Sequence, residues 1–261
     1  MKHQTLLCSL LVLVGTGCTR YYYRPNAVNA PLFTGGGQAH VAGSVDFSGD
    51  NKTDNGNTQH WNSTFVNLQA AVSPINHLAF MVNYSTYRYT TDRADTGSGN
   101  VNASAHLLEG AIGGYYAKGR KFKFVADCFV GYGAGPIWSD VNMNVDRFFV
   151  QPGVGVRSPA FDAAFNLRIS TVNYSHFNAN GHGVDYLQDH SLIDGNGTRI
   201  DGRTYTFAEP SFTVRGGYKF LKIQMQAVLS QDVNNNTPWH YNAFMYTVGL
   251  YFSLEDALKA R

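Results

Sequence analysis

Residues 244–252 read Phe-Met-Tyr-Thr-Val-Gly-Leu-Tyr-Phe, and this stretch decides the fold. Its large apolar residues stand at every second position, and they are Phe244, Tyr246, Val248, Leu250 and Phe252. The residues between them are smaller or carry polar groups. Because successive side chains of a β-strand point to opposite faces, the pattern predicts a strand with one apolar face. The same period returns in nine segments upstream, which is typical of a transmembrane β-barrel.

Ten segments are expected to be strands, because in each of them one parity is apolar and the other holds the charges. In 221–230, for example, Leu221, Ile223 and Met225 alternate with Lys222 and Gln224. The expected strands are residues 38–48, 62–73, 77–90, 103–117, 121–136, 147–157, 161–171, 205–218, 221–230 and 242–254. The last strand is expected to pair with the first and close the cylinder.

The connections between these strands alternate in length. Four are short and carry turn residues or cations, and they are 73–76, 118–120, 157–160 and 218–220. Five are long and rich in Asn, Asp, Gly, Ser and Thr, and they are 49–61, 91–102, 137–146, 175–204 and 231–241. Outer-membrane barrels have short periplasmic turns and long extracellular loops. The sequence therefore predicts an all-β fold, a closed antiparallel transmembrane β-barrel of about ten strands with up-and-down topology, over residues 38–254. Both termini are expected on the periplasmic side, and 255–261 as a solvated tail.

The composition agrees with a barrel rather than a helical membrane protein. The chain of 261 residues has 16 Tyr, 17 Phe and 27 Gly but only 15% charged residues. Its mean hydropathy is -0.23, which is not that of a helical membrane protein. The net charge of +2 comes without a clustered basic stripe, so no nucleic-acid partner is expected.

The first residues resemble an export signal. A basic start precedes an apolar run from Thr5 to Gly17, which is too short to span a bilayer, so 1–17 is expected to be a signal peptide. Gly15, Thr16 and Gly17 before Cys18 resemble the lipobox of bacterial lipoproteins, in which the cysteine is acylated. Ordinary signal cleavage after Gly17 is the alternative. The mature chain would keep only Cys18 and Cys128, so no disulfide framework is expected, and Cys128 is predicted to face lipid.

Residues 18–37 contain two prolines and a glycine run without a sustained period, so they are expected to form a periplasmic tether. The cysteine-terminated signal, the stretches 23–26 (Tyr-Arg-Pro-Asn) and 29–33 (Asn-Ala-Pro-Leu-Phe) and the barrel strands together resemble a group of small outer-membrane barrel proteins of Gram-negative bacteria, mostly of unassigned function. The resemblance implies an outer-membrane location, with the lipid bilayer and the barrel-insertion machinery as partners. Residues 249–252 resemble the C-terminal signal for insertion.

The inward parity of the strands collects charges of both signs. The predicted lumen network comprises Asp46, Glu109, Lys123, Asp127, Arg147, Asp162, Arg168, Glu209, Arg215 and Lys222, with Arg157 beside them. Side chains nearly fill a barrel of about this size, whereas open channels are typical of sixteen strands or more. The interpretation is an internal network of ion pairs and hydrogen bonds. A narrow ion-lined pore is the alternative.

The long loop 175–204 could carry chemistry, because imidazole and carboxylate together can bind zinc or transfer protons. Its members are His176, His182, Asp185, Asp189, His190, Asp194 and Asp201. Their spacing matches no metal or catalytic motif, so no metal, cofactor or catalytic residue is expected. The hypothesis is a non-catalytic outer-membrane barrel whose extracellular loops serve binding or adhesion to an unknown extracellular ligand. A narrow channel is the second possibility. A hydrolase at the rim, which would use histidines such as His60, His106 or His240, is the third.

Overall fold

The structure, a computed structural model, describes residues 22–54, 57–93, 101–234, 237, 239 and 241–258. The predicted signal peptide, residues 1–17, and the predicted lipidation site Cys18 lie outside the described residues. Within the described ranges, no helix is long and apolar enough to cross a membrane.

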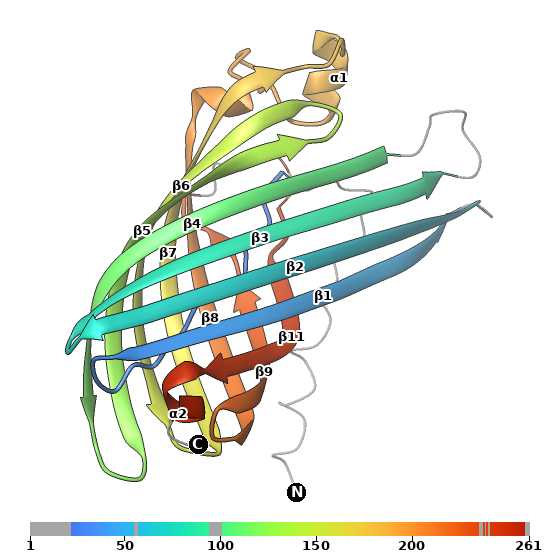
Figure 1. The fold of residues 1–261 in the computed structure, drawn as a ribbon. Coiled ribbons are helices and arrows are strands. Elements are labelled where there is room, and N and C mark those ends of the chain that lie inside the picture. The colour runs from blue at the N-terminus through green and yellow to red at the C-terminus, as the bar shows by residue number, and fades with distance from the viewer. Residues whose placement is uncertain are drawn as a thin grey trace, which may run out of the picture.

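The described chain forms one closed antiparallel barrel of ten long strands, as the sequence predicts (Figure 1). Every strand pairs with its neighbours in the chain, which is the up-and-down topology. The strands are β1 Gln38–Asp54, β2 Asn57–Ile75, β3 Leu78–Arg93, β4 Val101–Lys118, β5 Lys123–Trp138, β6 Asn142–Arg157, β7 Phe161–Asn178, β8 Thr204–Tyr218, β9 Leu221–Leu229 and β11 Phe244–Ser253. A two-residue strand, β10 (Gln231–Asp232), adds to the edge of β8. Each of the ten long strands pairs with two neighbours, but within the described residues β1 extends beyond its pairing with β11, which ends at Val45, while its pairing with β2 continues to Asp54.

The last strand closes the cylinder against the first, as expected. The seam joins β1 to β11 from His40 opposite Ser253 to Val45 opposite Val248. At its other edge, β11 pairs with β9. Residues 244–252 therefore form one side of the seam.

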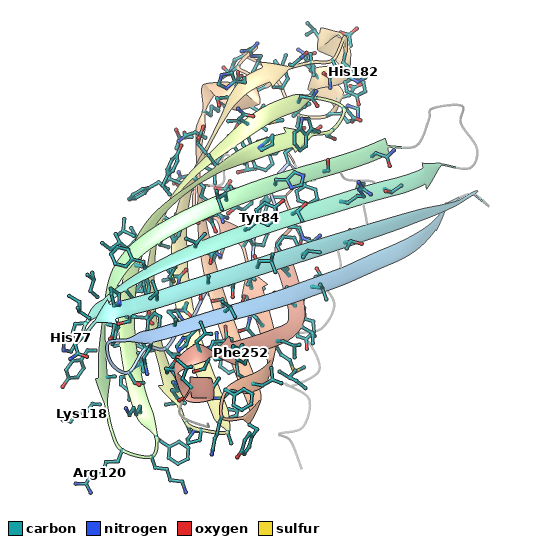
Figure 2. The ribbon with its side chains drawn as sticks, viewed as in Figure 1. His77, Tyr84, Lys118, Arg120, His182 and Phe252 are labelled. Atoms are coloured by element: carbon teal, nitrogen blue, oxygen red, sulfur yellow. The ribbon has the colours of Figure 1, made fainter. Side chains whose placement is uncertain are left out.

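The two ends of the barrel differ in their connections. Short turns link the strands at 76–77, 119–122, 158–160 and 219–220, and we call this the short-turn end. At Gly119 a side chain is excluded, because φ is +125° and a Cβ atom would lie 2.2 Å from the carbonyl oxygen of Phe122. The opposite end, which we call the long-loop end, carries residues 179–203 and 233–243. Figure 2 shows Lys118 and Arg120 at the first end and His182 at the second.

The strands run further than their apolar alternation at the long-loop end. The expected loop 49–61 is largely strand, since β1 and β2 keep their pairing up to Asp54 opposite Asn57. Backbone pairing needs no apolar face, so a ladder can continue where the alternation ends. The length predicted for this loop was wrong for that reason.

The apolar parity faces outward and the polar parity faces inward, which inverts the arrangement of a soluble protein. Leu108 is 57% exposed, and Glu109, the next residue of β4, is 1% exposed. Tyr84 and Phe252 point away from the wall (Figure 2). Cys128 is exposed on this outer face, next to the buried Phe129. An apolar exterior of this kind suits hydrocarbon rather than water.

The largest departure from the sequence prediction concerns the expected tether. Residues 22–36, which we call the lumen segment, lie inside the barrel, where Figure 1 shows them as a blue trace enclosed by the strands. Every residue from Pro25 to Phe33 is buried. The prediction of a solvated tether was wrong here, because backbone and side chains of this segment bond to inward-facing residues of distant strands.

The end of the chain differs as well. The expected solvated tail begins with a short helix, α2 (Leu254–Leu258), in which Glu255 is buried. This helix packs beside β1 at the short-turn end (Figure 1). Its acidic side chains belong to the network described below.

Candidate functional site

The lumen segment meets the wall at the long-loop end through its first residues. Tyr23 forms a bridge with Tyr241, and the Asn242 amide donates to the Tyr23 carbonyl at 3.0 Å. The Tyr174 hydroxyl donates to the carbonyl of Tyr22 at 3.0 Å. The Tyr23 ring stacks on Phe207 with centroids 4.1 Å apart. These contacts hold the start of the segment level with the long-loop ends of β7, β8 and β11.

Below Tyr23, two arginines and two glutamates form a buried, charge-balanced cluster. The Arg147 Nε donates to Glu109 at 2.9 Å, and the Arg168 Nε lies 3.1 Å from Glu209. The Tyr23 hydroxyl donates to Glu209 at 2.6 Å and accepts from Arg147 at 3.1 Å. All four charged side chains are at most 1% exposed. Each buried charge thus has an opposite charge within ion-pair distance, which offsets part of the cost of burial, while among the described residues the Nε and Nη1 atoms of Arg168 have no hydrogen-bond partner.

Asn26 completes this cluster from the lumen segment. Its side-chain amide donates to Glu109, and its side-chain oxygen accepts from Arg147. Its backbone carbonyl accepts from Arg168 at 2.9 Å. The segment therefore supplies partners that the strands alone lack.

The middle of the segment is held by amide side chains of the wall. The Gln226 side chain accepts from the Val28 amide at 2.7 Å and donates to the Val28 carbonyl at 2.8 Å, as a strand partner would. Asn29 donates to Asn83 at 3.0 Å, and Gln151 donates to the Asn29 carbonyl at 2.8 Å. Wall side chains thereby satisfy the amide and carbonyl of Val28 and the carbonyl of Asn29, although the segment has no strand partner there.

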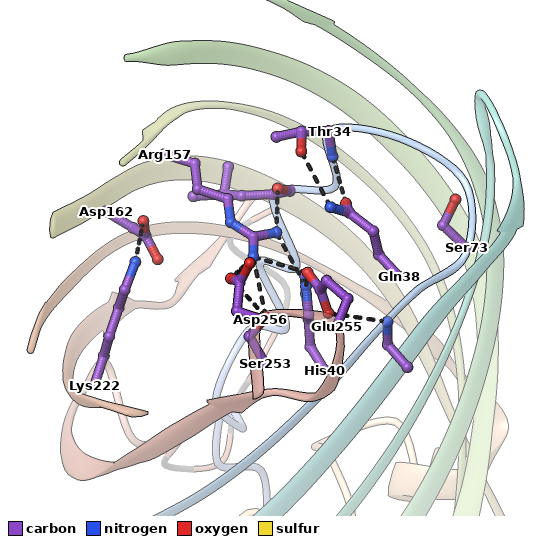
Figure 3. Close-up of polar contacts among 12 residues, drawn as sticks. Thr34, Gln38, His40, Ser73, Arg157, Asp162, Lys222, Ser253, Glu255 and Asp256 are labelled. Atoms are coloured by element: carbon purple, nitrogen blue, oxygen red, sulfur yellow. Dashed lines mark hydrogen bonds and ion pairs between the residues drawn. The ribbon is translucent and has the colours of Figure 1, made fainter. Parts of the chain in front are cut away.

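The short-turn end is closed by a polar cluster between the segment, β1, β6 and α2 (Figure 3). One guanidinium nitrogen of Arg157 lies 2.8 Å from both Glu255 and Asp256. The other donates to the Leu32 carbonyl at 3.4 Å, and His40 lies 2.8 Å from Glu255. Burial opposes the charged form of Glu255, but the hydrogen bond from His40 and the charge of Arg157 outweigh it and hold the pKa of Glu255 well below its usual range.

Two more cations lie near this cluster. Lys222 lies 2.7 Å from Asp162 (Figure 3) and also donates to the Ser158 carbonyl at 2.8 Å. Arg215 donates to Gln224 at 2.7 Å and sits 4.0 Å from the ring centroid of Tyr251. Outside them lies a cavity of about 410 Å³ at the short-turn mouth. Its lining includes Arg120, Lys121, Lys123, Arg157 and Lys219.

The loop 179–203, which we call the cap, covers part of the long-loop end. It contains the helix α1 (Val184–Asp189) and the 3-10 turn η1 (Ile200–Gly202). The loop buries Leu187, Leu192 and Ile200 against aromatic rings of the barrel mouth. Those rings belong to Tyr174, Tyr205, Phe207 and Trp239. The cap therefore folds as part of the barrel and not as a free loop.

The outer face of the cap carries an aromatic stack. The rings of His182 and Tyr186 are 3.8 Å apart, and those of Tyr186 and His190 are 4.1 Å apart. Val184 beside them is 59% exposed. The turn below is held by Asp194, whose pKa is lowered by the hydrogen bond from the backbone amide of Thr198. This face therefore presents stacked rings and an exposed apolar side chain on an ordered part of the loop.

The predicted lumen residues occupy three levels of the barrel. Glu109, Arg147, Arg168 and Glu209 meet in the central cluster, and Asp162, Lys222 and Arg215 lie toward the short-turn end. Asp46 pairs with Arg24 of the lumen segment. Lys123 is half-buried at the cationic mouth. Asp127 is buried, and among the described residues its Oδ1 atom has no hydrogen-bond partner.

Sequence reasoning missed the partners from the lumen segment, above all Tyr23, Asn26 and Asn29. The signal that could have found them is the number of inward amides, since Gln69, Asn83, Gln151, Gln224 and Gln226 all point into the lumen. Buried amides need partners. More inward-facing amides than the wall itself can pair would have indicated a polar segment inside the barrel.

Of the histidines considered for chemistry, His182 and His190 are brought together in the cap, where both rings stack on Tyr186. His106 contacts Tyr84 and Trp138, whereas His190 lies in the cap. His176 is exposed at the end of β7, and its ring lies 3.4 Å from the side chain of Asn144. Among the described residues, no group of three His, Cys, Asp or Glu side chains could hold a metal ion. His60 is described only in its backbone, and His240 lies outside the described residues.

No family model and no curated protein matches the sequence. Among solved structures, the chain is similar to the translocator domain of the autotransporter NalP from Neisseria meningitidis, with 12% identity and a TM-score of 0.43. The match covers 85% of this chain and 89% of that chain.

Proposed function

We propose that this protein is a non-conducting outer-membrane β-barrel that presents its long-loop end to the outside of a Gram-negative cell as a binding surface. The lipid bilayer and the barrel-insertion machinery are its expected partners, together with an extracellular ligand. Catalysis, a cofactor and nucleic acid have no part in the proposal. A single observation carries the preference over a channel: the lumen segment fills the barrel from Tyr22 to Phe33 and reaches the short-turn end at Gly36.

The membrane part of the proposal rests on the outer face of the strands. Large apolar side chains such as Leu108, Phe148 and Phe212 are at least 50% exposed. At about 25 cal/mol per Å², leaving such a belt in water would be costly, whereas hydrocarbon removes that cost. Short turns at one end and long loops at the other are the arrangement of outer-membrane barrels, with the loops outside.

The sealed lumen can be tested by conductance in planar bilayers. We expect the full chain to give no stable open steps. A variant that lacks residues 25–33 should give them, because it loses the chain that fills the lumen while the ten strands remain. Cys128→Ala, on the outer face, serves as the matched control and should stay closed. Stable steps from the unmodified protein would support the channel instead.

The binding surface can be tested with substitutions that spare the cap's anchors. His182→Ala, Val184→Ser and His190→Ala together alter the exposed face but keep Leu187, Leu192 and Ile200. Cells that display the protein would be applied to an array of glycans and matrix proteins. We expect binding that the triple variant loses and that Arg120→Ala, at the opposite end, keeps. Equal binding by the unmodified protein, the triple variant and Arg120→Ala would show that this surface is not the binding site.

A further inference from the structure

We propose that the chain upstream of Tyr22 leaves the barrel at the long-loop end, so that the mature N-terminus lies on the cell surface. The acyl group expected on Cys18 then inserts into the outer leaflet. The proposal rests on the orientation given above, with long loops outside. It reverses the expectation of a periplasmic N-terminus and leaves the C-terminal end on the periplasmic side.

The direction of the lumen segment is set by its two ends. At the lower end, the Gly36 amide donates to the Asn76 side chain at 2.7 Å, and the Gly37 amide donates to the Ser73 carbonyl at 2.7 Å. Asn76 belongs to the short turn between β2 and β3, and Ser73 lies near the short-turn end of β2. At the upper end, Tyr23 bridges Tyr241, which lies between β10 and β11 at the long-loop end.

The contacts between these ends descend in sequence order. Asn26 meets the central charge cluster, Val28 and Asn29 meet the wall amides, and the Leu32 carbonyl meets Arg157 near the short turns. No residue of this path doubles back. The segment therefore crosses the barrel once, and earlier residues lie closer to the long-loop end.

Chain length supports a full crossing. The fourteen steps from Tyr22 to Gly36 can span at most about 46 to 50 Å, and the hydrocarbon core is about 30 Å thick. Cys18 stands only four residues before Tyr22, which is a reach of about 14 Å at most. A group on Cys18 therefore cannot return to the leaflet at the short-turn end.

Tyr22 lies beside the cap at the long-loop mouth. Both belong to one apolar cluster that also includes residues of β4–β8 and Trp239. Toward β2–β6, Tyr22 borders a cavity of about 40 Å³. Its lining includes Phe65, Tyr87, Leu107 and Ile137. The cap and the emerging N-terminus thus share one mouth, and both contribute to the same outer surface.

The test uses single cysteines in a Cys128→Ala background. Arg20→Cys reports the N-terminus, Asn196→Cys the exposed cap turn, and Arg120→Cys the exposed short-turn end. Intact cells are treated with a maleimide on a polyethylene glycol that is too large for porins, and a second sample is permeabilised first. We expect labelling of positions 20 and 196 in intact cells, and of position 120 only after permeabilisation.

The labelling pattern tests separately the direction of the lumen segment and the orientation of the barrel. If position 20 is labelled only after permeabilisation, or only after unfolding, while position 196 reacts in intact cells, the threading is overturned. If position 120 reacts in intact cells and position 196 does not, the orientation under the proposed function is overturned, and position 20 should still follow position 196. The Cys128→Ala background alone should stay unlabelled. Labelling of it in intact cells places a free Cys18 outside, which supports the exit and rejects the acyl group.

Discussion

Leu108 and Glu109 are neighbours on β4, but their side chains lie in different surroundings. Leu108 points out of the barrel and is 57% exposed, whereas Glu109 is 1% exposed and bonds to Arg147 and Asn26. The outer face requires only that a side chain be apolar, since lipid tails make no directional contacts. The inner face requires particular partners, because an unpaired buried charge or amide is costly. One alternating pattern therefore contains a permissive rule and a strict one.

The strict rule predicts the largest effect at Glu109. Glu109→Ala leaves Arg147 and Arg168 buried with one carboxylate fewer, and breaking such a pair costs about 3 to 5 kcal/mol. Urea unfolding in phospholipid vesicles, followed by tryptophan fluorescence, measures the loss. Glu109→Gln keeps the shape without the charge and should lose less. Wild-type stability of Glu109→Ala would mean that the central cluster does not hold the lumen together.

The permissive rule has one boundary, which is charge. Leu108→Arg places a cation toward hydrocarbon near the middle of β4, and we expect a loss of about 2 to 4 kcal/mol in the same assay. Leu108→Phe keeps the residue apolar and should be close to neutral. If Leu108→Arg were tolerated as well as Leu108→Phe, this face would not contact lipid.

The lumen segment should follow the strict rule although it lies outside the strands. Asn29→Ala removes the hydrogen bonds to Asn83 at 3.0 Å and to the Ala70 carbonyl at 3.2 Å. Leaving buried partners unsatisfied costs about 1 to 3 kcal/mol. Asn196→Ala, on an exposed turn of the cap, is the control and should change little. An equal, small effect of both would contradict a segment that is packed inside the barrel.

The smallest effect is expected at Cys128, on the outer face. Cys128→Ala exchanges one small apolar side chain for another where no partner is required, so the free energy of unfolding should change by less than about 0.5 kcal/mol. The same vesicle assay measures it. A larger loss would show that the outer face also contains specific contacts.

The permissive rule is the part of the fold that the sequence predicted. An apolar outer face repeats every second residue along each strand, so ten strands and their outward parity could be predicted from residues such as Phe244 and Leu250. Where a strand runs beyond this apolar face, the pattern ends. The extension of β1 and β2 up to Asp54 and Asn57 was missed for that reason.

The specific partners that the inner face requires could not be predicted from the sequence. The lumen segment has no period, and its partners lie far away in the chain, as with Val28 and Gln226, which are 198 residues apart. Polar character, two prolines and a glycine run are equally compatible with a solvated linker. Glu255 was missed similarly, because its partners His40 and Arg157 lie 215 and 98 residues earlier in the chain.

The join between the lumen segment and β1 constrains the order of assembly. Gly37 turns the chain with φ of +75°, and β1 then runs back along the wall beside the segment it has just left. Once β1 has paired with β11 between His40 and Val45, the segment can leave only lengthwise, past the packed central cluster. We therefore expect the segment to be in place before the seam closes. The barrel is then wrapped around its own first residues, and closure of the last strand pair is the step that makes the threaded arrangement permanent.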